Sequence, residues 1–312
     1  PLHAAVQLLL TAAQTTRPDA FDHAVRGLLL AGAMAASVGA TFEHARLAML
    51  GGLLHDLGEM YIDPQYLDPR QALTAQSYRH VVSHAVVGQR LIEQLTDYPA
   101  ALAVAIGEHH ERLDGSGYPA RRQHDHITKL GRLLMVVEAV LGLTANFSAD
   151  DNTTLAQMSL ALRMVPGEFD PLWTGFVARI AKPPPDTGAV TAESREALRQ
   201  AWAQVRAAEQ AAQAIVAAAP AGGSSAQRLA LRVQERLGRL QLGFNAIGLW
   251  PDAVDHGALD PFELQTALRE LRFRLRSIWR DCAWSDGELE ATEDPALVAL
   301  RQQLQGEAAA AG

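Results

Sequence analysis

The sequence predicts an all-α protein. Apolar residues recur at three- and four-residue spacing along nearly the whole chain, which is the period of an amphipathic helix. No segment shows the strict alternation of apolar and polar residues that a half-buried strand would have. Asp170-Pro171 and Asp260-Pro261 have the form of helix starts, an acidic N-cap followed by proline at the first helical position.

In chain order, this periodicity predicts eight helices in the first part of the chain, over residues 3–15, 20–38, 42–55, 75–95, 99–110, 127–144, 151–163 and 171–181. Gly115, Gly117 and Pro119 interrupt the pattern after His110, so we expect a loop there. The uncharged apolar stretch 27–42 is shorter than the roughly 20 residues that a membrane span requires. We therefore expect a buried core helix in this region and no membrane span.

The run Lys182-Pro183-Pro184-Pro185-Asp186 marks the predicted domain boundary, because three prolines cannot continue a helix. We expect a first domain over 1–182, a proline-rich linker over 183–190 and a helical bundle over 191–312. This last part carries three amphipathic patterns: Leu198, Trp202, Val205 and Val216; Leu229, Val233, Leu237, Leu240, Phe244 and Ile247; and Leu264, Leu268, Leu271, Leu275 and Ile278. Their heptad-like spacing is compatible with a homodimer through these helices or with a self-contained bundle.

The net charge and the cysteine content indicate which partners and which cellular compartment to expect. The formal net charge is −8, and a nucleic-acid polymer usually binds to a basic face, so we expect no such partner. The single cysteine, Cys282, excludes a disulfide within the chain and fits a reducing compartment such as a cytoplasm. The sequence begins at Pro1 rather than Met, which leaves room for an upstream regulatory domain.

Histidine is concentrated in the first part of the chain. Ten of the 11 histidines precede residue 127, and two adjacent pairs stand out, His55-Asp56 and His109-His110. Imidazole is the commonest metal ligand among side chains, and adjacent ligand pairs together with single histidines from separate helices suit a site with at least two metals. Imidazole with carboxylate, in the absence of a thiolate set, suits Fe, Mn, Zn or Ni.

These residues resemble, in order and spacing, the HD-GYP domain, a branch of the HD metal-dependent phosphohydrolases. The resemblance covers roughly residues 15–181 and implies an HD-domain helical bundle followed by the second helical bundle. It is carried by His23-x-x-Arg26, His55-Asp56-Leu57-Gly58, His84-x-x-x-Gly88, the run from His109-His110-Glu111 to Gly117-Tyr118-Pro119, and Gly167-Glu168-Phe169-Asp170-Pro171.

The resemblance also implies the ligands of two or three divalent ions, with Asp56 as the bridge between them. Asp19 stands where metal-rich members place a glutamate, and Glu138 stands where an aspartate is usual. The implied metal ligands are Asp19, His23, His55, Asp56, His84, His109, His110 and Glu138.

As function, the resemblance implies hydrolysis of the bacterial messenger cyclic di-GMP to the linear dinucleotide pGpG or to GMP. Asp56 and Glu59 are the implied catalytic residues. Diguanylate-cyclase (GGDEF-type) proteins and other signalling proteins are implied as partners. The implied substrate-binding residues are Gly117, Tyr118, Pro119 and Lys129.

Three departures from the family pattern keep alternatives open. Glu59 replaces the usual lysine, Glu138 replaces an aspartate ligand, and Leu141 replaces a second aspartate. With Asp19, Asp56, Glu59 and Glu138 ionised, two divalent ions only neutralise the site. An anionic substrate would then be held weakly unless a third metal ion restores a positive charge, with Glu59 near or among its ligands, or unless Lys129 or Arg79 compensates. The alternatives are a degenerate signalling module that binds metal, nucleotide or a protein, and another HD-superfamily activity, either on a different nucleotide or as a di-iron oxygenase.

Overall fold

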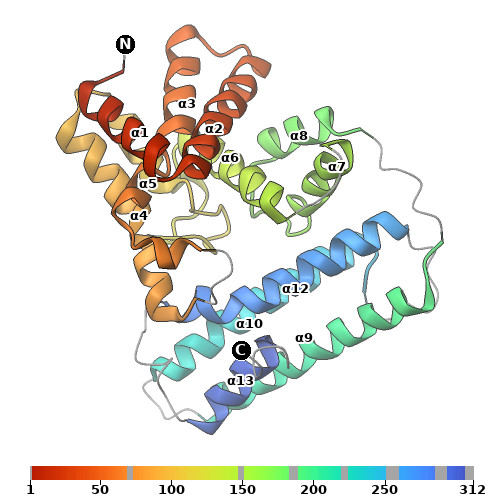
Figure 1. Cartoon of the computed structure of the whole chain (residues 1–312). Coiled ribbons are helices and arrows are strands. Elements are labelled where there is room, and N and C mark those ends of the chain that lie inside the picture. The colour runs from red at the N-terminus through yellow and green to blue at the C-terminus, as the bar shows by residue number, and fades with distance from the viewer. Residues whose placement is uncertain are drawn as a thin grey trace. The chain divides into compact units, whose positions relative to one another are not determined.

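The computed structural model describes residues 2–68, 73–146, 151–182, 189–218, 224–250, 260–284 and 294–305. Within these ranges the protein consists of twelve α-helices and short 3₁₀ helices, without a β-strand (Figure 1). The predicted all-α class is therefore confirmed. None of the described helices combines the length and the apolar character that a membrane-spanning segment needs.

The chain divides into two compact units. The first comprises Pro1–Gln71, His80–Leu162 and Gly167–Lys182, and the second comprises Ala72–Arg79, Arg163–Pro166 and Pro183–Gly312. The domain limits expected from the sequence stay a prediction, and residues 183–188 of the expected linker lie outside the described residues.

The helices predicted from periodicity lie in the first unit, except that the start of the helix over 75–95 belongs to the second. Each end lies within two residues of its predicted position. Short 3₁₀ helices between them, η1, η2 and η3, carry no such period and were not expected. The bounds are α1 Ala4–Thr16, α2 Pro18–Ser37, α3 Phe42–Leu54, η1 Leu57–Tyr61, η2 Pro64–Leu67, α4 Ala75–Leu95, α5 Ala100–Glu108, η3 His124–His126, α6 Lys129–Asn146, α7 Asp151–Ala161 and α8 Pro171–Ile180.

Helix caps account for where several of these helices begin. The Asp170 side chain accepts a hydrogen bond from the Leu172 N–H at 3.0 Å, which confirms the predicted start of α8. Thr41 caps α3 through the His44 N–H at 3.4 Å. Because α3 ends at Leu54, His55 is its C-cap residue and Asp56 already lies beyond the helix.

Helices α2 and α3 approach each other at two glycines. A Cβ atom on Gly27 would collide with the carbonyl oxygen of Gly52, and a Cβ on Gly52 would collide with that of Gly27. Only glycine permits this backbone contact. The close approach brings the α2 segment that carries His23 next to the end of α3 that carries His55.

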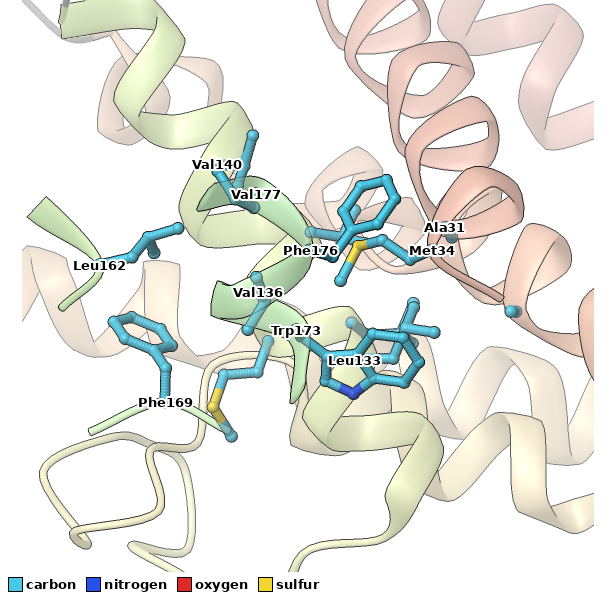
Figure 2. Packing of buried hydrophobic residues seen from close by; sticks show 14 of the residues in the cluster. Ala31, Met34, Leu133, Val136, Val140, Leu162, Phe169, Trp173, Phe176 and Val177 are labelled. Atoms are coloured by element: carbon cyan, nitrogen blue, oxygen red, sulfur yellow. The ribbon is translucent and has the colours of Figure 1, made fainter. Parts of the chain in front are cut away.

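The core of the first unit holds α6 in place. Its residues Leu133, Val136 and Val140 pack with the side chains of α2 and α8, as Figure 2 shows. Phe176 of α8 and Met34 of α2 belong to the same buried cluster. This packing fixes the rotation of α6 and therefore the direction of its polar residue Glu138.

The second unit is a bundle of four described helices, α9 Ala192–Ala218, α10 Ser225–Ala246, α12 Pro261–Ala283 and α13 Pro295–Gln305. Its core contains the predicted apolar positions, except that Val216 and Ile247 are only half-buried, and Ile215 is buried instead of Val216. The indole N–H of Trp202 donates to the Leu249 carbonyl at 2.9 Å. Helix α13, with Leu297 and Leu300 buried, was not predicted from the sequence.

Candidate metal centre

Seven of the predicted ligands meet in the first unit. Asp56 and His84 lie with His109 and His110 in one group, and the ligand atoms of that group are within 4.8 Å of one another. In the other group, which shares Asp56, the ligand atoms also lie within 4.8 Å of one another. Its members are His23, His55, Asp56 and Glu138. Five segments supply them: α2, the end of α3, α4, the end of α5, and α6.

Three of the histidines are oriented by their own backbone. The Nδ1 atom of His55 lies 3.0 Å from the Gly52 carbonyl oxygen. In His84 and His109 the equivalent distance, to the carbonyl three residues earlier, is 2.5 Å. A carbonyl only accepts, so Nδ1 carries the proton and donates in each case, which leaves Nε2 with a free lone pair. This is the arrangement in which histidine binds a metal through Nε2.

The Nε2 atoms face one another in pairs around Asp56. They are 3.2 Å apart in His23 and His55, and 3.1 Å apart in His84 and His109. Asp56 turns Oδ2 to the first pair, at 3.1 and 3.3 Å, and Oδ1 to the second pair, at 3.4 and 3.3 Å. One carboxylate therefore presents a different oxygen to each pair of imidazoles, as a bridge between two cations does.

The donor set fits metal ions. Asp56 Oδ1 is buried and has no hydrogen-bond partner among the described residues, although buried polar atoms are usually paired. Glu138 Oε2 lies 3.2 Å from Nε2 of both His23 and His55. Imidazole nitrogens with carboxylate oxygens and no thiolate suit Fe, Mn, Zn or Ni. The residues would hold two divalent ions, one in each group, with Asp56 between them.

Without a cation, protons compensate the carboxylates of this cluster. Burial by itself lowers the pKa of His23, but hydrogen bonds with Asp56 and Glu138 outweigh it and raise that pKa to about 10. Burial and the Asp56 charge act to raise the pKa of Glu138, yet its hydrogen bonds with His23 and His55 lower it. The pKa of His110 falls well below its usual value because the side chain is buried beside His109. Metal ions would replace these protons.

Residues 8–171, more than half of the chain, match the family model of the HD domain. The chain belongs to the HD domain family. Curated relatives agree with this assignment. The chain is 27% identical over 179 residues to "Cyclic di-GMP phosphodiesterase PA4108" of Pseudomonas aeruginosa, and the matched region covers 57% of this chain and 43% of that protein. It is also 27% identical over 140 residues to "3'3'-cGAMP-specific phosphodiesterase 3" of Vibrio cholerae, and this match covers 38% of this chain and 30% of that protein.

A third relative is "Cyclic di-GMP phosphodiesterase" of Thermotoga maritima, 27% identical over 118 residues, with 38% of this chain and 32% of that protein covered. This chain therefore spans less than half of the length of each of these relatives.

The loop after His110 packs against the metal centre of the HD domain. The Tyr118 ring stacks on the His110 ring with centroids 4.4 Å apart. The backbone N–H of Tyr118 donates to the His110 carbonyl at 3.1 Å. The Glu111 carboxylate accepts hydrogen bonds from the Ala120 and Arg122 N–H groups at 2.7 and 2.9 Å. These bonds hold the segment that contains Gly117 and Pro119 beside the ligand group to which His110 belongs.

Two of the residues predicted for the site, Asp19 and Lys129, are exposed on the surface. Asp19 is exposed on the first turn of α2 and belongs to neither ligand group. Lys129 is exposed at the first position of α6, and no described residue forms a hydrogen bond or ion pair with its side chain. The metal role of Asp19, and the substrate roles of Lys129, Gly117, Tyr118 and Pro119, stay predictions.

An arginine that the sequence reasoning overlooked pairs with Glu59. The Arg17 Nη2 lies 2.9 Å from Glu59 Oε2, and Nη1 donates to the Glu59 carbonyl oxygen at 3.1 Å. Burial and the Asp56 charge raise the pKa of Glu59, while His84 and Arg17 act against them. Arg79, expected as a compensating cation, instead donates to the Trp284 carbonyl in the second unit at 2.9 Å.

Proposed function

We propose that this protein is a metal-dependent phosphodiesterase of the HD-GYP type that hydrolyses cyclic di-GMP in the bacterial cytoplasm. The observation that carries the proposal is the Asp56 carboxylate, whose oxygens face two separate histidine pairs at 3.1 to 3.4 Å. Two neighbouring cations are the arrangement that suits an in-line displacement at phosphorus. Relatives named as phosphodiesterases of cyclic dinucleotides support the substrate class.

The reaction adds one water across one phosphodiester bond. A bond forms between the water oxygen and phosphorus, the bond from phosphorus to the ribose 3′ oxygen breaks, and that oxygen receives a proton, giving pGpG. Bound divalent ions, of which iron and manganese are our first choice, supply Lewis acidity and lower the pKa of water. The chain keeps the Nε2 atoms of His55, His84 and His109 in place, and Tyr118 shapes the pocket beside His110.

The charge balance supports turnover of an anionic substrate. Asp19 is exposed outside both ligand groups, and Arg17 neutralises Glu59. Only Asp56 and Glu138 then contribute uncompensated negative charge among the four carboxylates counted from the sequence. Two divalent ions would exceed this charge, so the centre would attract a phosphodiester rather than only balance its own carboxylates.

The decisive experiment measures metal content by elemental analysis and cleavage of cyclic di-GMP and 3'3'-cGAMP after loading with Mn(II) or Fe(II). We expect bound metal and cleavage of cyclic di-GMP, and we expect Asp56→Asn to lower activity at least about 100-fold because the bridge is lost. Glu43→Gln, a carboxylate that is 70% exposed, is the matched control and should leave activity unchanged. Preferred cleavage of 3'3'-cGAMP would revise the substrate, and full metal content without cleavage of either would refute the proposal.

A second candidate is a module that binds metal and nucleotide without turnover. It is favoured by Leu141, which is buried in the apolar cluster at the position where the resemblance implies another carboxylate. Saturable binding of cyclic di-GMP to the metal-loaded protein without product would select this candidate. Binding of GGDEF-type proteins and homodimerisation through the C-terminal helices stay predictions.

A further inference from the structure

Building on the proposed phosphodiesterase function, we infer that Arg17 is the phosphate-binding cation of the centre and that Glu59 positions it. Two contacts carry the inference. The guanidinium Nη2 lies 2.9 Å from Glu59 Oε2, and Nη1 donates to the Glu59 carbonyl oxygen at 3.1 Å. One residue therefore holds the guanidinium through both its side chain and its backbone.

Both members of the pair are anchored next to metal ligands. Glu59 belongs to η1, which follows directly on Asp56, and its N–H donates to the Asp56 carbonyl at 2.9 Å. Arg17 joins α1 to α2, with its N–H bonded to the Ala13 carbonyl at 2.7 Å, and α2 carries His23. The backbones that hold the two ligand groups thus also fix the position of the Arg17–Glu59 pair.

The chemistry of the pair suits a phosphate better than a metal ion. A guanidinium has five N–H donors, and Glu59 receives two hydrogen bonds from it, so further donors are left for an anion. Arginine binds phosphate oxygens in a bidentate manner. Glu59 belongs to neither ligand group, and its Oε2 contacts Arg17. The two side chains are 23% and 21% exposed, so a ligand entering from solvent can reach them.

The same contacts would exist if the pair only joined α1 to η1, so the test must separate ligand binding from stability. In the metal-loaded protein, Arg17→Ala should raise both the KM for cyclic di-GMP and the Kd for its slowly hydrolysed phosphorothioate analogue about 10- to 100-fold, because a charge-assisted hydrogen bond is lost. Metal content should not change. Arg17→Lys should recover part of the affinity, since it keeps the charge.

Glu59 provides a second, independent comparison. Glu59→Gln should raise the Kd less than Arg17→Ala does, because the guanidinium loses only its tether. In Arg17→Ala the unpaired Glu59 carboxylate repels the ligand, so the double variant Arg17→Ala/Glu59→Gln should bind more tightly than Arg17→Ala alone.

The matched control is Arg46→Ala, which removes an exposed arginine–glutamate pair with an Nη1–Oε2 distance of 3.4 Å and should leave Kd and KM unchanged. Arg17→Ala with a lower melting temperature but an unchanged Kd would overturn the inference, as would a loss of affinity fully explained by lost metal. If the wild-type protein binds the analogue without cleaving cyclic di-GMP, the proposed function fails, whereas the Kd series still decides the role of Arg17.

Discussion

At the residue scale, hydrogen bonds to the backbone orient the imidazoles of His55, His84 and His109 before any metal binds. Each Nδ1–H is directed at a carbonyl three residues earlier in the chain, so helix geometry alone sets the ring angle. A ligand that is already oriented loses less conformational freedom when the metal binds. These bonds also fix which nitrogen is available to the ion.

His23 gives the metal affinity a predictable dependence on pH. Its pKa of about 10 in the metal-free protein exceeds the ordinary 6.5, so its contribution to stability is complete below 6.5 and is lost as the pH rises through 10. A metal ion must displace this proton, so the metal-induced rise in melting temperature should grow between these pH values, with an affinity gain of about tenfold per pH unit for each proton released.

Thermal denaturation with and without Mn(II) across this range provides the measurement. The His23→Gln variant serves as control, because it has no proton to release and should show a shallower slope. An identical slope in both proteins would contradict the assignment of the proton to His23.

Residue by residue, the histidines of the centre could be predicted because they lie in short motifs of fixed spacing. The Arg17–Glu59 contact could not, because it joins residues 42 positions apart, and neither the charge pattern nor the periodicity relates them. Asp19 shows what spacing alone leaves open. Its position one helical turn before His23 predicts a shared site; the residue is exposed and belongs to neither ligand group, and its metal role stays a prediction.

At the element scale, the contact between α2 and α3 depends on the absence of two side chains. Gly52→Ala would force a Cβ into the backbone of Gly27, so we expect a loss of stability of about 1–3 kcal/mol from overpacking, together with reduced metal content as His23 and His55 separate. Chemical denaturation and elemental analysis measure the two effects.

Gly32→Ala, on α2 at another glycine that faces α3, is the matched control. Its Cβ would meet only the Met49 side chain, with the nearest atom at 3.0 Å, and that flexible chain can move. Alanine also favours the helix by up to about 1 kcal/mol. Equal losses of stability and metal in the two variants would argue against the backbone collision as the cause.

Elements with a sustained apolar period were predictable, and the eight helices α1 to α8 match within two residues. Helix α13 was missed because Leu297, Leu300 and Leu304 form only a short pattern. The 3₁₀ helix η1 was missed as well, since five residues carry no period, and it is the element on which Glu59 lies.

At the scale of the whole molecule, all seven grouped ligands belong to the first unit. A chain truncated after Lys182 should therefore keep the metal content of the full chain. Its melting temperature should fall, because Ala72–Arg79 and Arg163–Pro166 belong to the second unit. There the Arg280 guanidinium lies 4.2 Å from the Tyr78 ring centroid, and that contact would be lost.

Elemental analysis and thermal denaturation of the two chains check this expectation, with circular dichroism to confirm that the truncated chain is helical. A helical truncated chain without metal would show that the second unit is needed to form the centre.

The shared Asp56 predicts that two ions bound in the two ligand groups would not bind independently. Its two oxygens belong to one rigid carboxylate, so an ion that drew Oδ2 towards His23 and His55 would also rotate Oδ1 relative to His84 and His109. Occupancy of one group would then change the affinity of the other, and linkage requires the effect to be equal in both directions. A chelator that removed the ion from one group would alter the dissociation constant of the remaining ion by that same factor.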